Sequence, residues 1–235
     1  MARSRREGET AAPRAPASKR YRKGEETRRR ILDAALREFG AVGAAGATTR
    51  KIAQEAVVSL PALKYYFGGK RGLYLACARQ IVSEYQAHML VMLAGVRASL
   101  DEGASAEAAR AHLKAVLDAL VDLQIGRQQS DVWMSFVLRE IAEKGPAFGL
   151  LFEQLWAPGV DLVAELIGRI AGDRPGSMRP RLQALLLVSS LSAFSLARPI
   201  ALRYLRWMDL APASIDEIKA VLARQVDEIG AGGAS

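Results

Sequence analysis

Apolar residues recur every three or four positions from Thr27 almost to the end of the chain, and this spacing places them on one side of α-helices. Runs of Val, Ile and Thr, which favour strands, are scarce. The pattern therefore predicts an all-α protein. The first helix is expected to end at Gly40–Gly43, and its inward stripe consists of Ile31, Leu32, Ala35, Leu36 and Phe39.

Two short helices are predicted next, and each is opened by a side chain that can cap it: Thr48 or Thr49 before the first, and Ser59 before the second. Val57-Val58 forms a short break between them, and Gly68-Gly69 ends the second. A longer helix followed by two short helices across a tight turn is typical of a helix-turn-helix unit. The inward-facing residues of the short helices are expected to be Ile52, Ala53, Ala56, Leu60, Leu63 and Phe67.

The remaining two thirds of the chain also has helical spacing, interrupted by short polar breaks. Pro158-Gly159 is expected to break or kink one of these helices. The predicted helices cover residues 70–96, 104–125, 131–143, 147–169, 178–198, 199–207 and 215–229.

Positive charge is concentrated in the first third of the chain. Residues 1–23 carry eight basic residues against two acidic ones, residues 24–72 carry nine against five, and residues 73–235 carry sixteen against eighteen. A basic end on a near-neutral body indicates a polyanion partner bound at one place, with nucleic acid as the first candidate. Residues 1–23 themselves have two equally supported interpretations, a solvated disordered tail or an arm that touches DNA.

The second short helix has an outer face that suits a major groove. At about 100° per residue, Pro61 and Tyr65 point away from the inward stripe, and Ala62 and Lys64 flank them. Small, basic and aromatic side chains fit a groove about 12 Å wide, where Lys64 can neutralise a phosphate. Tyr66 lies nearer the inner face, where an ordinary core aromatic is at least as good an interpretation.

The runs TRRRILDAALREFGAVG and ATTRKIAQEAVVSLPALKYYFGGKRGLYLA resemble the N-terminal domain of the TetR family of bacterial transcriptional regulators. The segments LPALKYYFGGK, VWMSFVLRE and ARPIALRYL are similar to the CecR-like (YbiH-like) branch, so the resemblance covers nearly all of residues 25–210. It implies a helix-turn-helix over Thr48–Phe67, with DNA contacts from Thr48, Thr49, Arg50, Pro61, Ala62, Lys64, Tyr65, Tyr66 and Lys70. The resemblance places the first three and the last two at backbone phosphates and the other four in the groove.

Three residues depart from the family's pattern. Lys64 stands where many relatives have Tyr, which alters the expected base preference, and Ala44 stands where an aromatic commonly packs against the first helix. Val57 occupies a turn position where Gly is usual. If that turn still needs a positive φ, its β-branched residue is strained by about 1–2 kcal/mol. Either the turn has adjusted, or the domain is marginal until it dimerises or binds DNA.

The segment LQALLLVSSLSAFSLA is apolar on nearly every side, and a helix of that kind must be covered on every side. One chain can cover one side, and a second copy is the natural cover for the other. The resemblance implies the same, because TetR-type dimers pack their late helices into a four-helix bundle. We therefore expect a homodimer formed through Met178–Arg198 and Ile215–Ile229; the alternative is a central core helix within one subunit.

The C-terminal helices also offer residues for a small-molecule site. A cavity lined by apolar groups with a few polar ones is the usual ligand site, although an aromatic stripe at helical spacing is more often plain core. The available arginines favour an uncharged or anionic aromatic ligand over a cation. Aromatic walls are expected from Trp133, Phe136, Phe148, Phe152 and Trp156, and polar anchors from His112, Arg139, Glu140 and Arg198.

Enzyme and cofactor chemistry finds little support in the sequence. His88 and His112 are the only histidines and no acidic pair stands at metal spacing, so neither a metal nor a cofactor is expected. The single cysteine, Cys77, is interpreted as a buried structural thiol in a reducing cytoplasm. The longest stretch without charge, residues 182–197, falls short of the roughly 20 apolar residues of a membrane span, so a soluble protein is expected.

These observations predict a basic disordered tail over residues 1–24, a TetR-type helix-turn-helix domain over 25–85 and a larger ligand-binding and dimerisation domain over 86–235. The predicted function is a ligand-responsive transcriptional regulator, most simply a repressor, that binds a palindromic DNA operator as a homodimer. The alternative is a helical small-molecule-binding or adaptor protein whose helix-turn-helix has degenerated, given Val57 and Ala44.

Overall fold

A computed structural model describes residues 17–125 and 128–230, and every regular element in those ranges is helical. The all-α prediction is therefore confirmed. The elements are α1 (Ala17–Gly46), α2 (Thr49–Glu55), α3 (Leu60–Phe67), α4 (Lys70–Asp101), α5 (Ala106–Gln124), α6 (Gln128–Glu143), α7 (Phe148–Leu151), a π-helical turn η1 (Phe152–Trp156), α8 (Ala157–Ala171), α9 (Met178–Ser190), a 3₁₀ turn η2 (Leu191–Phe194), α10 (Arg198–Leu205) and α11 (Pro212–Asp227).

The first helix is longer than its apolar pattern indicates. It begins at Ala17, ten residues before Thr27, so residues 17–24 are helical although they were expected to belong to a disordered tail. Residues 1–16 of that expected tail lie outside the described residues. Near its other end α1 is kinked at Gly43, whose φ of 74° interrupts the helix, and this agrees with the predicted end at Gly40–Gly43.

Two predicted helices are interrupted in the structure. The helix predicted over 147–169 contains the π-helical turn η1. This turn ends just before Pro158, which lies in the first turn of α8. A π turn accommodates a proline there because proline has no N–H to donate to the helix. The helix predicted over 178–198 stops at Ser190 and continues as η2. There the hydroxyls of Ser190 and Ser192 donate to backbone carbonyls three residues earlier, at 2.7 and 2.5 Å, and such local bonds compete with the helical ladder.

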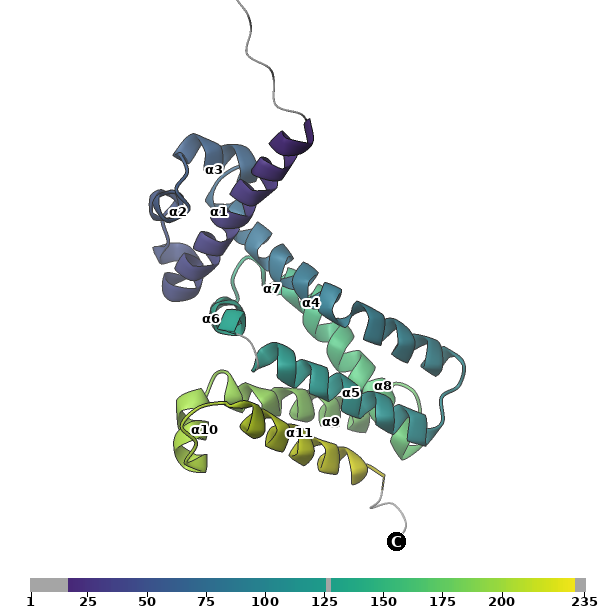
Figure 1. Cartoon of the computed structure of the whole chain (residues 1–235). Coiled ribbons are helices and arrows are strands. Elements are labelled where there is room, and N and C mark those ends of the chain that lie inside the picture. Colours follow the sequence, from purple (N-terminus) through teal and green to yellow (C-terminus); the bar gives the residue numbers. More distant parts are fainter. Residues whose placement is uncertain (1–16, 126–127, 231–235) are drawn as a thin grey trace, which may run out of the picture.

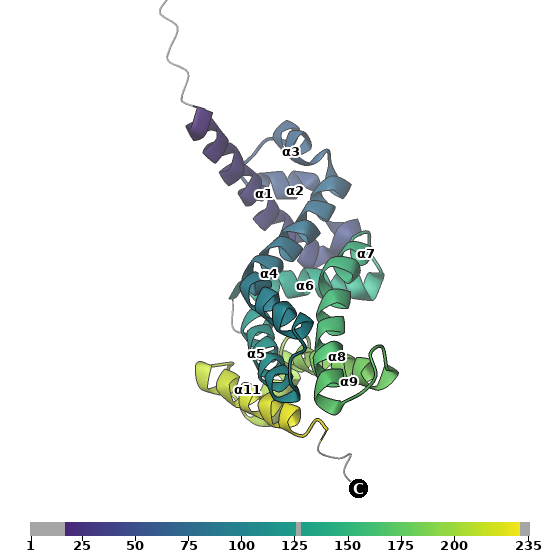
Figure 2. The ribbon, with the colours of Figure 1, turned by 90° about the vertical axis from the view of Figure 1, so that its right-hand side faces the viewer.

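The helices bury two separate apolar cores. The first joins α1, α2, α3 and the start of α4 with α6 and α7, and the second joins the rest of α4 with α5, α8, α9 and α11. Figures 1 and 2 show α3 at one end of the molecule and α9–α11 at the other, with α6 between them. The two ends are thus linked by the long helix α4 and by the packing of α6 on α1.

No single helix within the described ranges combines the length and apolarity needed to cross a membrane. The segments Met178–Phe194 and Arg198–Leu205 reach that length and composition only as a pair, which is bent by 79°.

Candidate nucleic-acid interface

Side-chain caps set the starts of α2 and α3. Thr48, rather than Thr49, is the N-cap of α2: its hydroxyl accepts a hydrogen bond from the Lys51 N–H at 3.2 Å. Ser59 caps α3 in the same way and accepts from the Ala62 N–H at 3.3 Å. Each cap satisfies a donor that the first helical turn leaves without an internal partner, so the two short helices start where the sequence predicted.

The turn between α2 and α3 retains the geometry for which glycine is usual. Val57 has a φ of 54°, and its side chain is 78% exposed. The Val58 N–H donates to the Ala53 carbonyl at 2.9 Å and the Val57 N–H donates to the Gln54 carbonyl at 3.1 Å, which is the pair of bonds that defines a Schellman helix end. The turn has therefore not adjusted to valine, and the backbone strain expected at Val57 is present.

The inner faces of α2 and α3 hold the unit together. Of the six residues predicted to face inward, Ile52, Ala53, Ala56, Leu63 and Phe67 are buried. The prediction is wrong for Leu60, the first residue of α3, which is 42% exposed.

The predicted DNA contacts from α3 lie mostly on its open side. Pro61, Lys64 and Tyr65 are exposed, and Tyr65 reaches 85% exposure. Ala62 is half-buried, and so is Tyr66, whose ring packs against the first core and lies 5.4 Å from the Tyr65 ring in an edge-to-face contact. The ring of Tyr66 therefore lies at the edge of the core, in agreement with the core interpretation, and a contact between its hydroxyl and a phosphate stays a prediction.

The remaining predicted contacts flank α3. At the start of α2, Thr48 and Arg50 are exposed and Thr49 is half-buried. Lys70 begins α4, and its ammonium group donates to the Ala45 carbonyl at 3.2 Å. An ammonium group has three N–H donors, so this bond leaves two of them available.

Two ion pairs join α1 to α2 within the unit. Arg37 on α1 pairs with Glu55 on α2 at 2.6 Å, and Lys51 on α2 pairs with the buried Glu38 on α1 at 2.5 Å. The hydrogen bond and charge of Glu38 raise the pKa of Lys51 above its ordinary value.

The exposed residues Arg50, Lys64 and Arg71 form no ion pair within the described part of the chain. They leave exposed positive charge on each of α2, α3 and α4. The sequence prediction omitted Arg71, although its position directly after Lys70 at the start of α4 could have indicated it.

Helix α6 binds the end of α1 directly. The guanidinium group of Arg139 donates to the carbonyls of Gly40 and Ala41, at 3.3 and 3.0 Å, and pairs with Glu143 at 2.9 Å. A methyl group on Gly40 would lie 3.3 Å from the side chain of Ser135, so the glycine is what permits this close approach. Arg139 therefore links α6 to two carbonyls of α1 just before the kink at Gly43.

A buried carboxylate joins α6 to α4. Glu140 is fully buried and accepts hydrogen bonds from the hydroxyl of Tyr74, on α4, and from the N–H of Ala147. The Tyr74 ring centroid lies 4.8 Å from those of both Phe39 on α1 and Phe136 on α6. Burial, followed by the bond to Glu140, raises the pKa of Tyr74 well above its ordinary range, so this hydroxyl remains a donor.

Most of the residues predicted to bind a small molecule take part in packing or hydrogen bonding between helices. Phe136, Trp133 and Trp156 belong to or pack against the first core, and Phe152 is half-exposed and stacks on Phe148 at 6.3 Å. Arg139 and Glu140 form the two junctions just described. His112 lies half-buried on α5, and Arg198 begins α10.

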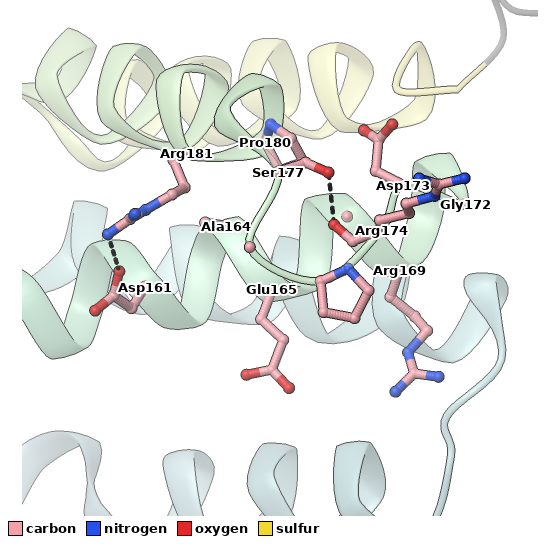
Figure 3. A pocket seen from close by; sticks show the side chains of 13 residues that line it. Asp161, Ala164, Glu165, Arg169, Gly172, Asp173, Arg174, Ser177, Pro180 and Arg181 are labelled. Atoms are coloured by element: carbon pink, nitrogen blue, oxygen red, sulfur yellow. Dashed lines mark hydrogen bonds and ion pairs between the residues drawn. The ribbon is translucent and has the colours of Figure 1, made fainter.

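A surface pocket of about 570 Å³ opens elsewhere, between α8, α9 and the loop that joins them. Figure 3 shows Asp161 on α8 facing Arg181 on α9, with an Nη2–Oδ1 distance of 3.7 Å, and Glu165 and Arg169 along α8. None of the residues predicted to bind a ligand lines this pocket.

An apolar stripe on α9 faces outward. It repeats at helical spacing and consists of Met178, Leu182, Leu185 and Leu186, each at least half-exposed; we call it the α9 stripe. Helix α10 adds the exposed Ile200 and Tyr204. Helix α11, by contrast, buries Ile218, Leu222 and Val226 within the same chain, where it packs against α5.

Comparisons with known proteins match both ends of the chain. The model of the C-terminal domain of the HTH-type transcriptional dual regulator CecR matches residues 109–233, and the model of the tetR family of bacterial regulatory proteins matches residues 31–77.

Among individual relatives, the HTH-type transcriptional dual regulator CecR of Shigella flexneri is 29% identical over 210 residues, which cover 86% of this chain and 88% of that protein. The regulator BetI 1 of Chromohalobacter salexigens is 31% identical over 110 residues, 46% of this chain and 50% of the relative.

Solved structures share the fold. The FadR regulator of Bacillus subtilis, crystallised with stearoyl-CoA, superposes with a TM-score of 0.57 at 14% identity and covers 85% of this chain and 97% of its own. A TetR-like transcriptional regulator from Rhodococcus sp. RHA1 superposes with a TM-score of 0.55 at 20% identity, with coverage of 88% and 96%.

Proposed function

Because the chain belongs to the TetR family of transcriptional regulators and carries a CecR-type C-terminal domain, we propose that it is a ligand-responsive repressor that binds a two-fold symmetric operator as a homodimer in the cytoplasm. The observation that carries this proposal is the capped α2–turn–α3 unit, whose open side carries Lys64 and the 85%-exposed Tyr65. A degenerate helix-turn-helix would be expected to lose those caps or its buried inner face.

We propose that α3 enters the major groove and that its neighbours bind the backbone. Pro61, Ala62, Lys64 and Tyr65 would face base edges, a role that suits small, basic and aromatic side chains. The phosphate contacts would come from Thr48, Thr49, Arg50, Tyr66 and Lys70. The unpaired charge of Arg71, at the start of α4, supports adding it to this set.

The homodimer is proposed to form through the α9 stripe. A stripe of four large apolar side chains exposed to water is unfavourable, and covering it with the same stripe of a second copy removes both from solvent. The α11 stripe, which the sequence included in the interface, is already used within the chain, so we assign it no such role. A symmetric pair would present two α3 helices about 34–36 Å apart, to successive major grooves.

The response to a ligand is proposed to pass through α6, because Arg139 binds the end of α1 and Glu140 binds Tyr74 on α4. A shift of α6 would then reposition both helices that support α3. To change operator occupancy from about 99:1 to 1:99, the ligand must prefer the non-binding conformation by about 5.5 kcal/mol. A ligand that binds free and DNA-bound protein equally tightly would contradict this part of the proposal.

Selection of bound sequences from a random duplex pool by the full-length protein tests the proposal. We expect a two-fold symmetric motif with half-site centres one helical turn apart, bound at least about 10³-fold more tightly than random duplex at the same salt concentration. A promoter fusion that carries the motif then reports the sign of regulation, since the Shigella relative is named a dual regulator.

Each part of the proposal can fail separately. An asymmetric motif would contradict the dimer, and activation of the promoter fusion would contradict repression. No enrichment of any sequence would contradict DNA recognition and favour a helical ligand-binding or adaptor protein instead.

A further inference from the structure

Helix α1 extends past the point where its apolar pattern begins. Its buried stripe starts at Ile31, yet the helix begins at Ala17. In Figures 1 and 2 the N-terminal end of α1 lies at the same end of the molecule as α3, away from α5 and α8–α11. The extension therefore buries little, and packing alone does not account for its length.

Close approaches place this extension beside the recognition helix. A methyl group built on Gly24 would lie 3.7 Å from the hydroxyl oxygen of Tyr66, so the backbone of α1 passes close to that residue. One helical turn later, the guanidinium carbon of Arg28 lies 5.6 Å from the centroid of the Phe67 ring, the last residue of α3. Residues 24–28 thus run along the C-terminal half of α3.

Four cations on this part of α1 are exposed: Arg22, Lys23, Arg29 and Arg30. None forms an ion pair within the described ranges, even though Glu25 and Glu26 lie on the same helix. Arg22 and Lys23 precede Gly24 by two and one residues, which is within about 3 Å along the axis at a rise of about 1.5 Å per residue. At about 100° per residue their side chains project from solvent-exposed sides of α1, at the level along its axis where Gly24 passes Tyr66.

We propose that these four residues, the basic arm, bind backbone phosphates that flank the base pairs read by α3. Duplex DNA carries a phosphate charge about every 1.7 Å of its axis, so exposed cations on a helix that passes the end of α3 would meet phosphates beside the groove and no base edges. This inference rests on the proposed function and extends the DNA-binding surface beyond the helix-turn-helix. The arm adds affinity and salt dependence but no base preference.

A charge-neutral variant tests the arm. R22Q/K23Q/R29Q/R30Q should keep the selected motif but bind it more weakly, and the slope of log affinity against log salt should become shallower by about 0.9 for each phosphate that the variant no longer neutralises, up to about 3.6 per protomer. The matched control R22K/R29K/R30K keeps every charge and should retain the parent slope. Helical circular dichroism and sedimentation check that both variants remain folded and associate as the parent does.

The length of the duplex supplies a second readout. On a longer duplex the parent should bind more tightly than the neutral variant. On a duplex trimmed to the motif, the two proteins should bind with similar affinity. If the neutral variant's slope of log affinity against log salt stays within about 0.9 of the parent's on the long duplex, the basic arm does not bind phosphates. That result would leave the proposed function intact. A parent without any salt slope or sequence preference would instead overturn the proposed function.

Discussion

The helix-turn-helix end and the α9 end of the molecule expose opposite kinds of surface. Around α2 and α3 the inward-facing Ile52, Leu63 and Phe67 are buried, and exposed side chains of this unit include Arg50, Lys64 and Tyr65. On α9 the arrangement is reversed: only Pro180 and Ala184 are buried, while the leucines of the α9 stripe face outward.

This difference separates two kinds of partner. A charged and aromatic surface on a complete core can stay in water until a polyanion arrives, because its groups are well solvated there. An apolar stripe gains free energy whenever it is covered, so it favours a permanent partner such as a second copy.

The largest effect is expected from charges placed in the α9 stripe. Leu182→Glu/Leu186→Glu would bury four carboxylates in a symmetric interface, which should raise the dimer dissociation constant by about 10³-fold or more, roughly 4 kcal/mol. Sedimentation velocity measures the association. Val221→Glu, at an exposed position on α11, is the matched control and should leave the dimer unchanged; a dimer that survives the α9 change would refute the assignment.

Removing the buried carboxylate should have the next largest effect. Glu140→Ala leaves the Tyr74 hydroxyl and the Ala147 N–H without their acceptor, which should lower the free energy of unfolding by about 2–4 kcal/mol. Chemical denaturation measures the loss. Glu143→Ala, which removes an exposed partner of Arg139, should cost less than about 1 kcal/mol, and equal costs for the two variants would contradict the buried junction.

Tyr74 adds a dependence on alkaline pH. Its pKa is raised in the folded protein by burial and by Glu140. The folded state therefore holds the proton more tightly than the unfolded chain, and this contribution is complete below about pH 10 and is lost as the pH rises further. Tyr74→Phe should show a smaller decline in stability above about pH 10 than the parent does, measured by denaturation at each pH.

Two lysines separate positioning from base preference. Lys70→Ala should weaken binding to every duplex by a similar factor and make the salt slope shallower by about one unit, because it removes a phosphate contact. Lys64→Ala should in addition relax base preference, with about 1–3 kcal/mol of discrimination lost at one position. Titrations on motif and mutated-motif duplexes measure both, and identical behaviour of the two variants would contradict their separate roles.

The smallest effect is expected at the strained turn. Val57→Gly relieves the positive φ but increases the entropy of the unfolded chain, so it should stabilise the protein by about 0.5–1 kcal/mol. Val58→Gly, one residue later and packed against the first core, should destabilise it. Destabilisation by Val57→Gly would mean that the valine makes a contact that outweighs its strain.

Much of the fold could be predicted because its signals are local. Thr48 and Ser59 cap helices through bonds to N–H groups three residues away, and the break at Val57-Val58 follows from the end of an apolar series. The length of α1 could not be predicted this way, since residues 17–26 are mostly polar and carry no apolar stripe. The end of α9 was also missed, because serine hydroxyls that bond backward leave no mark in the apolar spacing.

The candidate interface was predicted more fully than the sensing part of the molecule. The exposed Lys64 and Tyr65 follow from the angular spacing of a single helix. The ligand-binding candidates lie on several helices, and their relative positions depend on packing between segments far apart in sequence. Arg139, expected as a ligand anchor, instead binds α1 across a long separation in sequence.

By itself, the sequence determined the helical class, the helix-turn-helix and the basic end of the chain, because periodicity, caps and charge act over a few residues. Only the tertiary structure decided that Glu140 is a buried acceptor for Tyr74 and that α6 packs closely against α1 at Gly40. It also decided that α9 rather than α11 keeps its apolar stripe exposed. The physical reason is that burial and hydrogen-bond pairing between distant segments depend on which helices pack together, and an amphipathic stripe alone does not specify which neighbour will cover it.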